Sequence, residues 1–153
     1  MKKVQPREKL IRHTYERFPI VPENKNLYGL IASLEIINYN LKNEKYKKSY
    51  EDYILLLNNK NFNTLYITFI AIHGSYNLLN KIDSEKILIL LTYVDKSLES
   101  FMGHYFEILY MLSFTHDSND KIQSLYNEII NHDKISASIK ERVRKLNEFK
   151  KYK

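Results

Sequence analysis

The sequence predicts an all-α protein of about seven or eight helices in antiparallel pairs. All three prolines lie at or before Pro22, so the rest of the chain can form helices without a proline break. Apolar residues recur at helical spacing, most clearly in the stripe Ile122, Leu125, Tyr126, Ile129 and Ile130. No stretch combines alternating β-branched residues with the turn signals of a hairpin. These observations favour helices throughout the chain.

The expected helices are separated by short joints that are polar or carry Gly, Pro or a capping residue. Helices that begin near residues 23, 62 and 103 recur at intervals of about 40 residues, which is close to the period of HEAT-type two-helix repeats. No repeat consensus accompanies this spacing. A compact helical bundle and a short HEAT-like α-solenoid therefore both remain open. The approximate ranges are 6–18, 23–42, 44–58, 62–80, 84–101, 103–116, 118–132 and 137–150.

Length and composition predict one soluble domain that spans residues 1–153. A chain of this size can bury roughly 68 to 70% of the surface that it exposes when unfolded. Residues 1–20 are expected to form a basic helix or arm, residues 23–132 the core helices, and residues 137–153 a basic terminal helix. The chain has no cysteine, which excludes disulfides and thiolate metal sites.

The same features predict a cytoplasmic protein that does not enter a membrane. The charged start of the chain lacks the apolar segment of a signal peptide, and the longest apolar runs are too short to cross a bilayer. Lys, Asn, Ile and Tyr are abundant while Gly, Pro and Ala are scarce, a bias that indicates AT-rich coding and so a low-GC bacterium or a mobile element.

Two helices are expected at the centre of the domain, because Leu65 to Leu79 and Phe101 to Phe114 are apolar almost all round the helical wheel. A row of tyrosines that includes Tyr46, Tyr50 and Tyr53 is expected at the edge of the core, with hydroxyl groups that reach water.

Serines mark the starts of the last two helices. Ser118 is the expected N-cap of the helix near 118–132. Either Ser136 or Ser138 precedes the final helix, and Ser138 with Glu141 has the spacing of a capping box.

Four polar residues on the apolar sides of the predicted helices could form a site, namely Glu35, His73, His104 and Glu107. An ionised carboxylate in such surroundings needs a partner, because its desolvation is costly. A metal or acid–base enzyme site is one interpretation. Di-iron bundles, however, use two Glu-x-x-His pairs, whereas His104 and Glu107 form one pair in the reverse order. We favour a structural network in which imidazole and tyrosine hydroxyl groups satisfy the carboxylates, so no catalytic residue, metal or cofactor is assigned.

The ends of the chain carry its positive charge. The formal net charge is +6, with +4 on residues 1–17 and +5 on residues 140–153, which leaves −3 for the middle. In the last helix, Ile139, Val143, Leu146 and Phe149 are expected to face the body. The predicted partner-binding residues on the remaining surface are Lys140, Arg142, Arg144, Lys145 and Lys151. Such a surface suits an acidic protein or a nucleic acid.

In size and composition the chain resembles the small all-helical immunity proteins of bacterial conflict systems, which bind and block a cognate toxin. The favoured function is therefore a non-enzymatic helical protein-binding module, of the immunity type. The first alternative is a nucleic-acid-associated regulatory protein that uses its basic termini. The second is an enzyme that uses His73, His104 and Glu107. The chain contains no phosphate-binding loop, zinc-protease motif or nucleophile elbow, which argues against the enzyme.

Overall fold

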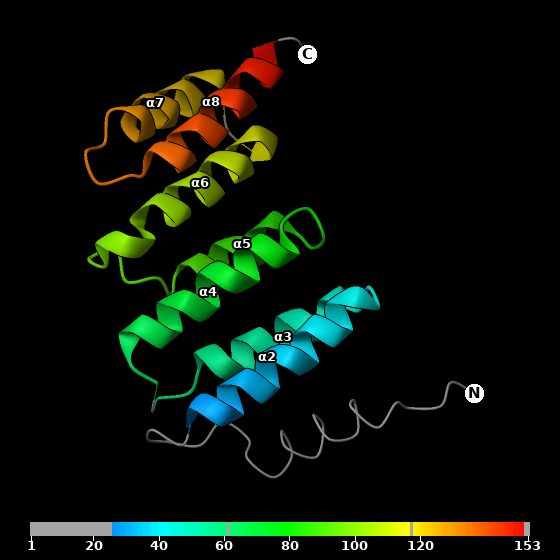
Figure 1. The fold of residues 1–153 in the computed structure, drawn as a ribbon. Helices are drawn as coiled ribbons and strands as arrows, with labels where there is room; N and C mark the ends of the chain where they lie inside the picture. Colours follow the sequence, from blue (N-terminus) through cyan, green and yellow to red (C-terminus); the bar gives the residue numbers. More distant parts are fainter. Residues whose placement is uncertain (1–25, 61, 117, 152–153) are drawn as a thin grey trace. The chain divides into compact units, whose positions relative to one another are not determined.

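The structure is a computed structural model that describes residues 26–60, 62–116 and 118–151. Within these ranges it contains seven α-helices and no strand, which confirms the predicted all-α class (Figure 1). No described helix has the length and apolar character needed to cross a membrane. The predicted helix near 6–18 lies outside the described residues. The helices are α2 (Asn26–Lys42), α3 (Tyr46–Leu57), α4 (Thr64–Leu78), α5 (Ser84–Leu91), α6 (Glu99–His116), α7 (Asn119–Ile130) and α8 (Ala137–Lys151).

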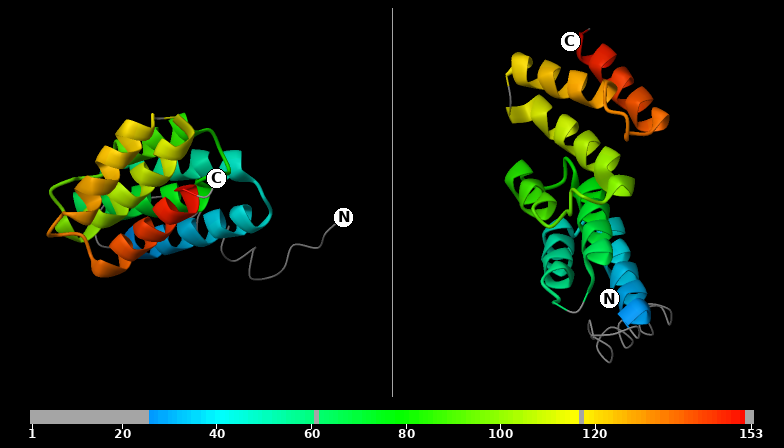
Figure 2. Two further views of the ribbon diagram at one scale, coloured as in Figure 1. Left: turned by 90° about the horizontal axis from the view of Figure 1, so that it is seen from above. Right: turned by 90° about the vertical axis from the view of Figure 1, so that its left-hand side faces the viewer.

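The described helices fall into two compact units that meet in sequence between Val94 and Asp95. In the first unit each helix packs against the next one, so that α3 lies between α2 and α4, and α4 contacts α5. In the second unit α6 packs against both α7 and α8, which also contact each other, and Figure 2 shows these three helices side by side. The single domain over 1–153 and the choice between bundle and solenoid remain predictions.

The joint between α5 and α6 does not lie where the sequence suggested. Two helices were expected over 84–101 and 103–116, but α5 already ends at Leu91 and α6 begins at Glu99. Asp95 starts a tight turn in between, because its carboxylate accepts hydrogen bonds from the Ser97 amide (3.0 Å) and hydroxyl (2.6 Å). These bonds lower the pKa of Asp95.

Gly103 lies inside α6 and therefore does not break the helix. A Cβ atom placed on Gly103 would lie 2.7 Å from the Cδ1 atom of Ile139 on α8. The glycine thus permits close packing of α6 against α8.

Side-chain caps fix the starts of three helices. Asn63 accepts a hydrogen bond from the Tyr66 amide at 3.0 Å and caps α4. Ser118 caps α7 as predicted, by accepting from the Lys121 amide. For α8 the cap is Ser136, whose hydroxyl accepts from the Ile139 amide at 3.4 Å. The capping box at Ser138 was wrong, because Ser138 lies inside α8.

The core of the second unit is an apolar cluster to which all three helices contribute. Tyr110 of α6 lies among buried residues of α7, α8 and the loop between them. Its ring contacts Phe114 edge-on, and burial raises its pKa to about 12. Its hydroxyl donates a hydrogen bond to Asn147 Oδ1 of α8 at 3.1 Å. The other buried members of the cluster are Ile122, Ile129, Ile135, Ile139 and Val143.

The two helices expected at the centre differ in their exposure. No residue of α6 from Phe101 to Phe114 is exposed, in line with the prediction. The prediction was wrong for α4, where Ile70 is fully buried but Leu65 (48%) and Phe69 (38%) are exposed. Residues 61–80 contain no Asp, Glu, Lys or Arg. The helical wheel of α4 therefore has no charged side that would mark its solvent face.

Tyr53 was expected at the core edge but is completely buried. Tyr46 and Tyr50 of the same row are partly exposed, with Lys81 and Lys86 over their rings at 5.5 and 5.4 Å from the ring centroids. The predicted contact with water is therefore wrong for Tyr53, whose hydroxyl binds protein groups instead.

Candidate functional site

His73 belongs to a polar cluster between α3 and α4 of the first unit. The Tyr53 hydroxyl lies 2.6 Å from His73 Nδ1, and Asn77 Nδ2 lies 3.3 Å from the same hydroxyl. Burial lowers the pKa of His73 and raises that of Tyr53, so both groups are neutral near pH 7. A neutral imidazole accepts the Tyr53 O–H through Nδ1. The cluster therefore links α3 to α4 through uncharged groups.

The four predicted polar residues do not make a metal site in the described part of the chain. Glu35 lies on α2 and is partly exposed, His73 binds Tyr53, and His104 and Glu107 lie on α6. Among the described residues, no three His, Asp or Glu side chains are placed to hold a metal ion.

Glu107 is paired with Arg142, a partner that was not predicted from the sequence. Its side chain is only 4% exposed, and its two carboxylate oxygens accept from Arg142 Nε at 2.7 Å and Arg142 Nη2 at 3.1 Å. This paired geometry is the strongest form of an arginine–carboxylate bond. The carboxylate was expected to bind imidazole and tyrosine hydroxyl groups, and the Arg142 guanidinium was not among the expected partners. The sequence did contain a signal for this bond. Arg142 is three residues after Ile139 and four before Leu146, which places it beside the buried stripe of α8.

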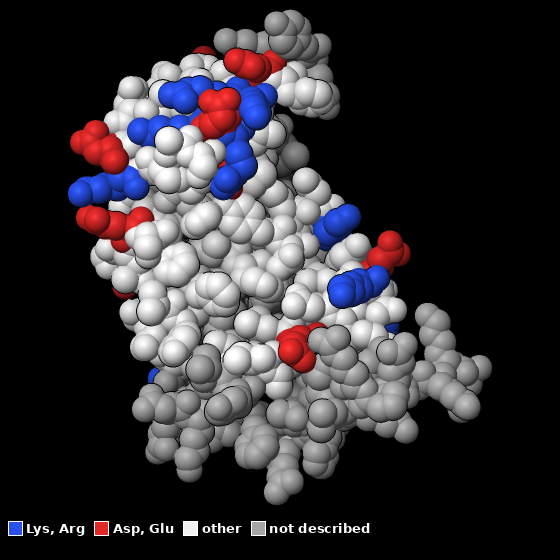
Figure 3. All heavy atoms as spheres, viewed as in Figure 1, with Lys and Arg blue, Asp and Glu red and all other residues white. Residues whose placement is uncertain are grey.

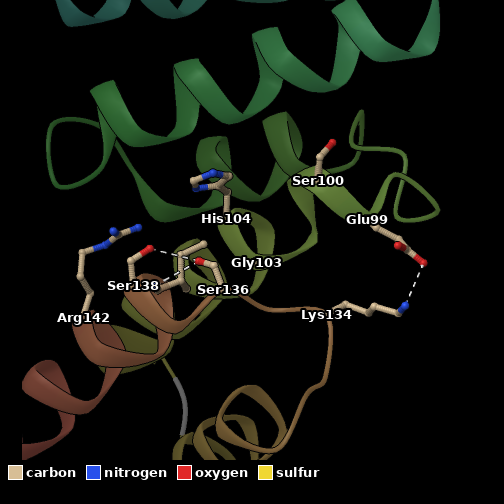
Figure 4. A pocket seen from close by; sticks show the side chains of 9 residues that line it. Glu99, Ser100, Gly103, His104, Lys134, Ser136, Ser138 and Arg142 are labelled. Atoms are coloured by element: carbon tan, nitrogen blue, oxygen red, sulfur yellow. Dashed lines mark hydrogen bonds and ion pairs between the residues drawn. The ribbon is translucent and has the colours of Figure 1, made fainter.

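The same arginine lines a polar cavity of the second unit, shown in Figure 4. The cavity has a volume of about 320 Å³ and lies between α6 and the start of α8. His104 and Arg142 are the two predicted residues that the structure brings together here, and Figure 4 shows both side chains on one side of the cavity. The remaining lining residues were not predicted as site residues and are Glu99, Ser100, Gly103, Lys134, Ser136, Ser138 and Ile139.

The outer face of α8 carries the other predicted partner-binding residues. Arg144 and Lys145 are exposed and Lys140 is partly exposed, while the side chain of Lys151 is outside the described part. Figure 3 shows Lys and Arg side chains gathered over this helix with acidic side chains among them. Arg144 lies 3.7 Å from Glu141, and both side chains are about half exposed, so this pair contributes little to stability.

Comparison with known proteins adds no assignment to these observations. Neither a protein-family model, nor a curated protein, nor a solved structure matches the chain.

Proposed function

We propose that the protein is a non-enzymatic helical protein-binding module that docks an acidic surface of another protein on α8. The observation that carries the proposal is the charge of this helix, which has six Lys or Arg residues against two Glu. Arg144 and Lys145 present this charge to solvent, whereas Ile139 and Val143 are buried and hold the helix on its unit. Opposite charges on the two partners would accelerate and orient their encounter.

Arg144 and Lys145 are the cations of α8 that we expect a partner to contact. The Arg142 side chain is 51% exposed, but its Nε and Nη2 atoms donate to the buried Glu107, so fewer of its donors can contact a partner. Glu141 and Glu148 also interrupt the positive face of the helix. A duplex would meet these carboxylates with its phosphates, whereas a protein surface can place its own cations opposite them. This interruption favours a protein over a nucleic acid. Because the chain resembles immunity proteins in size and composition, a toxin is the partner class that we propose first.

The test compares charge-reversal variants on two parts of the molecule. Arg144→Glu combined with Lys145→Glu reverses the outer face of α8 and leaves Arg142 intact. Lys47→Glu combined with Lys121→Glu reverses two exposed lysines on other helices and serves as the matched control. An acidic partner is first captured with the intact protein and purified. We expect it to bind the control variant as tightly as the intact protein, and the α8 variant at least tenfold more weakly.

Nucleic acid is the alternative outcome of the same experiment. Fluorescent duplex and single-stranded DNA are titrated at several salt concentrations. A nucleic-acid binder loses affinity linearly on a log–log plot, with a slope of about −0.9 per phosphate contact on duplex DNA. Submicromolar DNA binding at about 150 mM salt that the α8 variant abolishes would replace the proposal with the regulatory alternative.

A further inference from the structure

One side of α4 is exposed, largely aromatic and uncharged. Leu65 and Phe69 lie one turn apart and are 48% and 38% exposed, and Tyr66 beside them is 36% exposed. His73, which is partly exposed, and Asn77, which is exposed, continue the same side at the four-residue spacing of a helix. None of the 24 Lys or Arg and 18 Asp or Glu residues of the chain lies on α4. We call these five residues the aromatic face of α4.

The rings of this face are held in place before a partner arrives. The Phe69 ring centroid lies 5.8 Å from that of His73, and the Tyr66 centroid lies 6.2 Å from that of Phe62. His73 is in turn hydrogen-bonded to the Tyr53 hydroxyl, which lies 2.6 Å from its Nδ1 atom. Rings that are fixed in advance lose less conformational entropy on binding. The aromatic face is therefore a preformed surface.

The charge of the chain favours a second copy as the partner of this face. A two-fold contact brings the same patch of both copies together, and each copy has a formal net charge of +6. Most surfaces of the chain would therefore oppose like charges in such a contact, whereas the aromatic face opposes none. Aromatic rings pack on aromatic rings, and the Tyr66 hydroxyl can both donate and accept a hydrogen bond. The face is thus complementary to itself.

The size of the face limits the strength of the contact. From Leu65 to Asn77 it extends for about 18 Å at the rise of an α-helix. A Tyr or Phe side chain can bury roughly 200 Å², so the exposed fractions of Tyr66 and Phe69 leave roughly 75 Å² on each. Standard interfaces bury about 800 Å² per partner, which this face does not reach. The contact therefore belongs to the small, transient class.

We propose that two copies of this chain pack through the aromatic faces of α4 about a two-fold axis and form a transient homodimer. For an interface of this size we expect a dissociation constant on the order of 100 μM. The inference does not rest on the surface of α8, because α4 carries no charge that an acidic partner would pair with. Either proposal can therefore fail while the other stands.

The test is sedimentation velocity of the full chain in one buffer, from about 10 μM to about 1 mM, a range that brackets the expected constant. We expect the sedimentation coefficient to rise with concentration from the monomer value toward the dimer value. Leu65→Glu should weaken the association at least tenfold, because a two-fold interface would bury the new carboxylate twice. Leu65 lies in the first turn of α4, where an acidic side chain suits the helix dipole, so this variant should fold.

A second variant and a control accompany Leu65→Glu. Phe69→Ala removes a ring from the face without adding charge and should weaken the association about tenfold. Ile31→Glu is the matched control, because Ile31 is 46% exposed but lies on α2, which α3 separates from α4. It should leave the association unchanged. Circular dichroism checks that each variant keeps its helix content, and if one α4 variant loses it, the other decides.

Weaker association in the α4 variants, with none in Ile31→Glu, supports the homodimer. A chain that stays monomeric up to about 1 mM would overturn it. So would association that the folded α4 variants leave as tight as in the intact chain. If Arg144→Glu combined with Lys145→Glu abolishes the association while Leu65→Glu preserves it, the contact between copies is made by α8 and the inference fails.

Discussion

Removing either partner of the Glu107–Arg142 pair should destabilise the protein, but by unequal amounts. Arg142→Ala leaves a carboxylate that is 4% exposed without its guanidinium, whereas Glu107→Ala leaves an arginine that is 51% exposed. Breaking a buried ion pair typically costs about 3 to 5 kcal/mol because a charge stays buried. We expect about 3 kcal/mol for Arg142→Ala. For Glu107→Ala we expect about 1 to 2 kcal/mol, since water can solvate the remaining cation and the loss is that of charge-assisted hydrogen bonds.

The measurement is urea unfolding followed by circular dichroism and by tyrosine fluorescence. Two probes are needed because the chain has two compact units, and coincident transitions would justify a two-state analysis. Arg144→Ala is the matched control, as it removes an arginine of the same helix that faces solvent. Its effect should stay below about 0.5 kcal/mol.

The order of the three variants tests the reasoning. If Glu107→Ala were as destabilising as Arg142→Ala, the cost would not come from a buried carboxylate. If Arg142→Ala matched the Arg144→Ala control, the pair would have no role in stability. Either result would refute the assignment of Glu107 as a buried anion that needs Arg142.

Two further predictions concern the packing of the helices. Burial lowers the pKa of His73, so the unfolded chain takes up a proton at a higher pH than the folded chain. The contribution of the neutral His73 to the free energy of unfolding should be complete above about pH 6.5 and be lost as the pH falls through the lowered pKa. His73→Gln should therefore flatten the pH dependence of the free energy of unfolding, measured with urea. An unchanged pH dependence in this variant would contradict the prediction. Gly103→Ala should destabilise by about 1 kcal/mol, because the new Cβ meets Ile139 Cδ1. Combining it with Ile139→Val, which removes that atom, should cost less than the sum of the single variants in thermal melts; an additive result would exclude the contact.

Local patterns were enough to predict most of the helices. The stripe of α7 and its Ser118 cap depend on residues within a few positions of each other, and both are confirmed. In α8 the expected inner residues Ile139 and Val143 are buried, whereas Phe149 is 63% exposed and was wrongly placed. Phe149 lies near the end of α8, two residues before Lys151.

Contacts across long separations could not be predicted in the same way. The bond between Glu107 and Arg142 joins residues 35 positions apart, and that between Tyr53 and His73 joins residues 20 apart. The sequence showed that a buried carboxylate needs a partner, but the choice among many candidates depends on how α6 and α8 cross. The polar cavity was missed for the same reason. Its serines and Lys134 are ordinary surface residues until α8 packs beside α6.

The absence of charge on α4 separates this helix from α8 in its response to salt. Dissolved ions screen the attraction between opposite charges, so a contact made through Arg144 and Lys145 weakens as ionic strength rises. A contact made through Leu65 and Phe69 has no charge to screen, and strongly hydrated salts such as sulfate favour the burial of its apolar surface. Sulfate is therefore expected to act on the two kinds of contact in opposite directions. Added sulfate should weaken an electrostatic contact on α8 and strengthen an apolar contact on α4.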